Sequence, residues 1–226
     1  MSNVVAQEEP TLLSHFDDLQ QQDDSTKLGM WTFLATEVMF FGGMFLAYIL
    51  FRWKYHTGFA VGSNELYMWF GFFNTGVLLC SSLSMALAVD FAKLGKLKPL
   101  LINLVITMVL GTMFLGVKAV EYTIDYKEAL IPGLNFHPHH LLEKLGSVDL
   151  SHVELFFVLY FAMTGLHALH MIIGIAAIGV LAWMIHRKKF ADGTTVESLG
   201  LYWHFVDLVW VFLFPLLYLI DLSHKI

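Results

Sequence analysis

The chain has 226 residues, of which 57% are hydrophobic and 14% charged, and its formal net charge is −6. Soluble domains carry about 25% charged residues, so this composition predicts an integral membrane protein and argues against a soluble enzyme. The single cysteine, Cys80, excludes an internal disulfide, and the sequence contains no CxxC or CxxCH pattern that would indicate a thiolate metal site or a covalently attached haem. We expect no nucleic-acid partner.

The chain begins with a polar, acidic segment, residues 1–28, that carries much of the negative charge. It lacks the basic start and the apolar core of a signal peptide. Such a composition predicts a solvated tail. Its acidic residues are Glu8, Glu9, Asp17, Asp18, Asp23 and Asp24.

Five segments follow that are apolar and long enough to cross a bilayer core about 30 Å thick as helices. Lipid offers the backbone no hydrogen-bond partners, so helices are the expected solution. We therefore predict an all-α fold, in which residues 29–226 form a single transmembrane bundle of five helices. The spans cover approximately residues 29–51, 67–89, 99–122, 155–185 and 199–220.

Basic residues near the span ends predict the orientation of the bundle. They flank the spans more closely on the side of the N-terminus, which predicts the N-terminus inside and the C-terminus outside. The short chain is typical of a multi-pass protein of a bacterial inner (cytoplasmic) membrane. The inner basic residues are Lys27, Lys93, Lys96, Lys98, Arg187, Lys188 and Lys189.

Ionisable side chains interrupt three of the spans. A charge at mid-membrane costs about 2.5–3.5 kcal/mol, so such residues are functional candidates by default. At a rise of 1.5 Å per residue they lie at about one depth, in the inner half of the membrane. We predict a polar cluster that handles protons or contacts lipid, and hydrogen bonding between helices is the simpler alternative. The cluster consists of Glu37, His167, His170, His204 and Asp207.

Two further pairings follow from the spacing of polar residues. Lys118 and Glu121 share a helix face near the outer end of the third span, which predicts a structural ion pair. Either His167 or His170, with His204, would also allow a haem to be held between two helices, and this alternative stays open. The run HPHH at residues 137–140 has no acidic or thiolate partner, so we expect no metal site there.

Small residues inside the spans predict positions where helices approach each other closely. The glycines expected to do so are Gly42, Gly43, Gly111, Gly116, Gly165 and Gly174.

Several stretches resemble signature helices of a known family. The segments TFLATEVMFFGGMFLAY, TGLHALHMIIG and YWHFVDLVWVFLF resemble three helices of subunit III of the haem-copper cytochrome c oxidases. GTMFLGVKAVEY resembles the helix that ends in a Glu-Tyr pair in that family. The resemblance covers all five spans in the family's order. Many members have seven spans, and this chain is similar to the last five of them.

The resemblance implies a subunit without its own redox centre, packed against subunit I in a complex that also contains subunit II. The haem and copper lie on those partner subunits. In the family, an intramembrane glutamate matches Glu37, a His-x-x-His matches His167 and His170, and a last-helix pair matches His204 and Asp207. The implied role is to support proton uptake and the stability of the catalytic subunit during electron transfer from cytochrome c to oxygen. Bound phospholipid is also implied.

Alternatives within and outside the family remain at this point. Glu37 and the wording YWHFVD favour the cytochrome c type, in which cytochrome c or quinol would be contacted only through the complex. The alternatives are a quinol oxidase subunit III, an accessory subunit of a nitric-oxide reductase, and a haem-binding membrane cytochrome.

Overall fold

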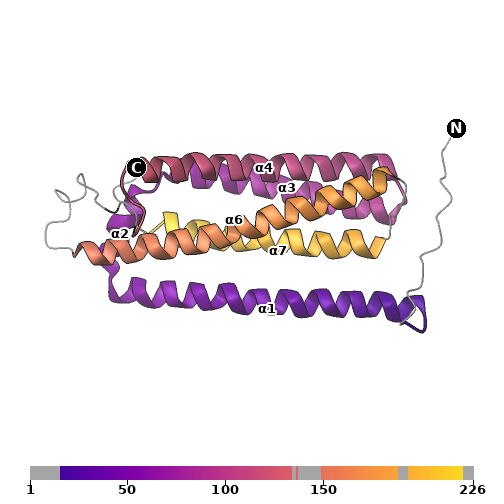
Figure 1. Ribbon diagram of the computed structural model, residues 1–226, viewed down its shortest axis with the longest axis horizontal. Helices are drawn as coiled ribbons and strands as arrows, with labels where there is room; N and C mark the ends of the chain where they lie inside the picture. Colours follow the sequence, from indigo (N-terminus) through magenta and orange to yellow (C-terminus); the bar gives the residue numbers. More distant parts are fainter. Residues whose placement is uncertain (1–15, 134–135, 137–148, 188–192, 221–226) are drawn as a thin grey trace.

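The computed structural model describes residues 16–133, 136, 149–187 and 193–220 (Figure 1). These residues form helices and contain no strand. Five of the helices are long and apolar enough to cross a membrane, and the short α2 is not. The expectation of an all-α membrane bundle of five spans is confirmed. The helices are α1 Leu19–Lys54, α2 His56–Glu65, α3 Met68–Lys93, α4 Leu97–Lys127, α6 Leu150–His186 and α7 Gly193–Tyr218.

The first helix extends beyond its predicted span. It starts at Leu19, inside the segment expected to be a solvated tail. The Asp18 side chain caps it by accepting a hydrogen bond from the backbone N–H of Gln21 at 2.6 Å. The polar start of α1 is exposed, so this part of the expected tail is both helical and solvated.

Four helices form a closed ring. α3 contacts α4 and α7, and α6 contacts the same two helices from the opposite side. Figure 1 shows α1 running beside α7 along the lower edge of this ring. The short α2 packs mainly on α6, and it returns the chain from α1 to the start of α3. The core lies inside the ring, where Trp203, Trp210 and Phe114 are fully buried.

Helix α1 contributes little to this core. Its buried side chains are Leu34, Phe41 and Tyr48, which are seven residues apart and therefore form one narrow stripe. The rest of the helix presents large apolar side chains to the outside, among them Val38, Met39, Leu46, Leu50 and Trp53. A helix with this surface needs lipid or another protein around it.

Close packing depends on some of the expected glycines and not on others. A Cβ at Gly111 would lie 2.8 Å from the Trp203 ring, and a Cβ at Gly174 would lie 3.0 Å from the same ring. Trp203 of α7 thus fills a space that α4 and α6 leave for it. The expectation was wrong for the other glycines, where a Cβ would meet nothing within 4 Å; these are Gly42, Gly43, Gly116 and Gly165.

Two glycines outside the predicted spans allow α2 to pack closely on α6. A Cβ at Gly58 would lie 2.6 Å from Cβ of His152, and one at Gly62 would overlap the ring of Phe156. Their spacing of four residues places both on one face of α2, directly against α6.

The end of α7 is completed by side chains of other helices. The last carbonyls of a helix have no partner within it, and lipid supplies none. Here the Tyr48 hydroxyl donates to the carbonyl of Leu216 at 2.9 Å, and the Ser63 hydroxyl donates to that of Leu217 at 2.8 Å. α1 and α2 are thereby fixed to the end of α7.

Candidate functional site

Glu37 and His170 meet between α1 and α6. Oε2 of Glu37 lies 3.2 Å from Nε2 of His170, which is an ion-pair distance without the alignment of a hydrogen bond. Nδ1 of His170 lies 2.8 Å from the carbonyl oxygen of Leu166. A carbonyl only accepts, so Nδ1 carries the hydrogen of the neutral ring. One further proton can then lie either on Glu37 or on Nε2 of His170.

Aromatic residues of α1 and α7 enclose this pair. The Phe41 ring lies 5.3 Å from the His170 ring and 6.2 Å from the Phe205 ring, centroid to centroid. The Tyr202 hydroxyl donates to the backbone carbonyl of His170 at 2.9 Å. The side chains of Glu37 and His170 stay 18% and 13% exposed. The pair therefore lies at the edge of the bundle, where α1 meets the ring.

The other three residues of the predicted cluster lie apart from this pair. Nδ1 of His204 lies 2.8 Å from the Ser82 hydroxyl. His167 and Asp207 are buried; neither ring nitrogen of His167 has a hydrogen-bond partner, whereas the Ser82 side chain interacts with Asp207 as well as with His204. Among the described residues, no hydrogen bond or ion pair joins these three to the Glu37–His170 pair. The structure thus brings together two of the five predicted residues.

The geometry also bears on the haem alternative. His167 lies between the rings of Phe114 and Trp210, each 5.3 Å away between centroids, so aromatic rings occupy the space beside its imidazole. Both ring nitrogens of His170 are engaged, by Leu166 and by Glu37. Within the described ranges, no group of three or more His, Cys, Asp or Glu side chains is arranged to hold a metal ion. The HPHH run at residues 137–140 lies outside these ranges.

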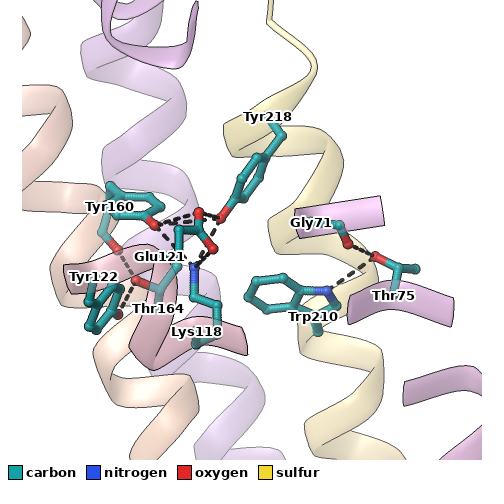
Figure 2. Close-up of polar contacts among 9 residues, drawn as sticks. All are labelled: Gly71, Thr75, Lys118, Glu121, Tyr122, Tyr160, Thr164, Trp210 and Tyr218. Carbon is teal, nitrogen blue, oxygen red and sulfur yellow. Dashed lines mark hydrogen bonds and ion pairs between the residues drawn. The ribbon is translucent and has the colours of Figure 1, made fainter. Parts of the chain in front are cut away.

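A second polar site lies inside the ring, toward the end of α4 (Figure 2). The expected ion pair forms there: Nζ of Lys118 lies 3.0 Å from Oε2 of Glu121, and the side chains are 4% and 0% exposed. Nζ also donates to the hydroxyls of Tyr218 at 3.0 Å and Tyr160 at 3.1 Å. Both hydroxyls donate in turn to Oε1 of Glu121.

Aromatic rings and one more acid surround this pair. Nζ of Lys118 lies 5.0–5.6 Å from the ring centroids of Tyr122, Tyr160, Trp210 and Tyr218, which is within the range of cation–π attraction. Asp125 lies on the same face of α4 and is 1% exposed. The sequence interpretation missed both tyrosines and Asp125. The signal of the tyrosines was present, because a tyrosine hydroxyl inside a span needs a partner, whereas Asp125 lies beyond the predicted end of the third span at residue 122.

Known proteins match this chain over most of its length. A sequence model of the family described as cytochrome c oxidase subunit III matches residues 147–221. The cytochrome c oxidase subunit 3 of Thermostichus vulcanus is 30% identical over 208 residues, which cover 90% of this chain and 92% of that protein. The chain belongs to the cytochrome c oxidase subunit III family. The resemblance of its signature helices to that family is thereby confirmed.

Subunit III relatives with other names match to a similar degree. A probable quinol oxidase subunit 3 of Staphylococcus aureus (strain USA300) is 27% identical over 92% of this chain and 96% of its own length. A heme-copper oxidase subunit I+III of Aeropyrum pernix is 29% identical over 97% of this chain, which corresponds to 25% of that protein. The subunit III family therefore includes cytochrome c and quinol types, and one relative whose name joins subunits I and III.

Proposed function

We propose that this chain is the non-catalytic subunit III of a haem-copper terminal oxidase, with cytochrome c as the electron donor of the complex. Its partners are oxidase subunits I and II, which hold the haem and copper. The observation that carries the proposal is the match to a cytochrome c oxidase subunit 3 over 90% of the chain. The relative named subunit I+III supports a position beside subunit I, and the apolar outer face of α1 provides a surface for that partner or for phospholipid.

Within this complex, the Glu37–His170 pair supports proton uptake and the stability of the catalytic subunit. Nε2 of His170 faces the Glu37 carboxyl at 3.2 Å while Nδ1 stays bonded to Leu166, which places an acid and a base side by side within the membrane. The remaining predicted residues, His167, His204 and Asp207, act in this proposal by keeping the inner half of the bundle polar.

The subunit lies in a bacterial cytoplasmic membrane with its N-terminus inside. Support comes from the basic residues Lys93, Lys98 and Arg187. They gather at the end of the bundle where α3 meets α4 and where α6 ends, the same end as the start of α1 (Figure 1). By the positive-inside rule, these residues support a cytoplasmic location for that end.

The proton-handling role is tested by Glu37→Gln in the purified, intact complex. Gln keeps the size of Glu and removes the exchangeable proton. We expect normal assembly with slower proton uptake and a shorter active lifetime during turnover. The matched control is Glu197→Gln, since Glu197 forms an exposed ion pair with Lys93 at 3.3 Å. A Glu37→Gln enzyme that takes up protons and survives like the wild type would leave the pair only a packing role.

The assignment as a subunit without a redox centre is tested by the visible spectrum of the tagged chain. We expect haem absorbance in the captured complex and a colourless chain after a detergent wash that removes the partners. Haem retained in equal amounts by the stripped chain would refute the assignment and support a membrane cytochrome. Comparison of reduced cytochrome c with a quinol as donor to the complex distinguishes the two oxidase types.

A further inference from the structure

The site around Lys118 forms a closed hydrogen-bond network. An ammonium group has three N–H donors, and three oxygens accept them: Oε2 of Glu121 and the hydroxyls of Tyr160 and Tyr218. Each hydroxyl accepts from Lys118 and passes its own hydrogen to Oε1 of Glu121. All donors are used only when Lys118 carries its charge and Glu121 is an ionised carboxylate that accepts three hydrogen bonds.

Asp125 is a second buried acid beside this network, and Lys118 makes no ion pair with it. It follows Glu121 by one turn on the same face of α4, and its Oδ2 has no hydrogen-bond partner. The groups that act on it electrostatically are Lys118, Glu121 and Glu128, and the Tyr160 hydroxyl of α6 lies within hydrogen-bond reach of its side chain. The single positive charge of Lys118 is already matched by Glu121. A second carboxylate would therefore be an uncompensated negative charge in a buried place, which is costly.

We propose that Asp125 carries a proton in the folded subunit, so that this network is a site for one exchangeable proton at the end of the bundle opposite the start of α1. Its members are Lys118, Glu121, Asp125, Tyr160 and Tyr218. The site is independent of the Glu37–His170 pair. Asp125 lies two residues before the end of α4 at Lys127, and half-buried Glu128 follows directly, so the proton reaches solvent through the last turn of the helix.

The proposal makes a counting prediction for protonated carboxyl groups in the network. The wild type holds two acids against one lysine, which gives one protonated carboxyl. Asp125→Asn leaves one acid against one lysine and gives none. Lys118→Gln leaves two acids without a positive charge and gives two. Glu128→Gln changes a half-buried acid that accepts a hydrogen bond from Tyr67 outside the network, and it leaves the count at one.

The count is measured by infrared spectroscopy of the purified complex at pH 7. Protonated carboxyl groups have their own C=O stretching band, which moves in heavy water. In the difference spectrum of variant minus wild type, the bands of all other carboxyl groups, including that of Glu37, cancel. We expect Asp125→Asn to lose one such band, Lys118→Gln to gain one, and Glu128→Gln to change nothing. An unchanged spectrum for Asp125→Asn, or no gain for Lys118→Gln, would overturn the proposal.

A second measurement tests the proposal even if one of the variants assembles poorly. Asn is a neutral isostere of a protonated Asp, whereas Gln does not replace an ionised Glu. We therefore expect Asp125→Asn to assemble and melt like the wild type, and Glu121→Gln to lower both the yield and the melting temperature of the complex. Equal losses in the two variants would mean that Asp125 is ionised, which contradicts the proposal.

Discussion

The hydroxyl of Tyr48 on α1 donates a hydrogen bond to the backbone carbonyl of Leu216 in the last turn of α7, at 2.9 Å. Because α1 buries only a narrow stripe of side chains, this bond adds to a small set of contacts that fix it to the ring. Tyr48→Phe keeps the ring and leaves the carbonyl unpaired. We expect a loss of about 0.5–1.5 kcal/mol in the free energy of unfolding, measured by SDS titration in mixed micelles.

The control for this change is Tyr67→Phe. Tyr67 donates to Glu128 at 3.0 Å in an exposed position, so its loss should change the free energy of unfolding by no more than about 0.5 kcal/mol. Equal effects of the two variants would show that the Tyr48 hydrogen bond contributes no more to the free energy of unfolding than the exposed Tyr67 hydrogen bond.

Two glycines of α4 should respond oppositely to alanine. Ala is favoured over Gly inside a helix by about 1 kcal/mol, so Gly116→Ala, which meets nothing within 4 Å, should raise the melting temperature of the complex. Gly111→Ala places its Cβ 2.8 Å from the Trp203 ring and should lower the melting temperature. The comparison by thermal unfolding is decisive, since the same substitution is made twice in one helix. Stabilisation by both would mean that Trp203 moves aside freely.

The two lysine ion pairs should differ in their contribution to stability. Lys118→Met leaves Glu121 buried without its counter-charge, and we expect a loss of about 3–5 kcal/mol in the free energy of unfolding. Lys93→Met removes a pair whose side chains are 55% and 42% exposed, and we expect about 0–1 kcal/mol. Chemical unfolding of both variants measures the difference. A small effect of Lys118→Met would indicate that Glu121 takes up a proton without penalty.

The start of α6 should depend on pH through Asp149. Hydrogen bonds from Ser151, including its backbone N–H at 3.1 Å, lower the pKa of Asp149 below its ordinary value. A lowered pKa means that the ionised cap stabilises the helix end at neutral pH. This stabilisation is lost as the pH falls below about 3.9, the ordinary value, through the lowered one.

Hydrogen exchange of the first-turn amides of α6 measures this loss. The amides should lose protection on acidification in the wild type, relative to Asp149→Asn at the same pH. Asn keeps the acceptor oxygen and does not titrate. Parallel pH profiles of the two proteins would exclude the carboxylate as the cause.

The spans and their order could be predicted because hydropathy and length depend on residues next to each other in the sequence. The ion pair of Lys118 with Glu121 was also predictable, since residues three apart share a helix face. The partners that other helices supply could not be predicted. Tyr160 and Tyr218 reach that pair from α6 and α7, and nothing local in α4 indicates them.

The same reasoning explains the predicted cluster. Similar depth in the membrane is necessary for contact, but the direction of each side chain around its helix decides the partner. His170 points toward α1 and meets Glu37, whereas His167, three residues earlier, lies against Phe114 and Trp210. Depth follows from counting residues along one helix. Rotation follows only from how the helices pack, which the sequence of one helix does not contain.

The position of Trp203 between Gly111 and Gly174 has an evolutionary consequence. Three helices share one volume, so the three positions are not free to vary independently. A relative with a smaller residue in place of Trp203 would tolerate alanine or serine at both glycine positions, and a relative that keeps the tryptophan would keep both glycines. Selection on this part of the bundle thus acts on a triplet of residues that lie far apart in the gene.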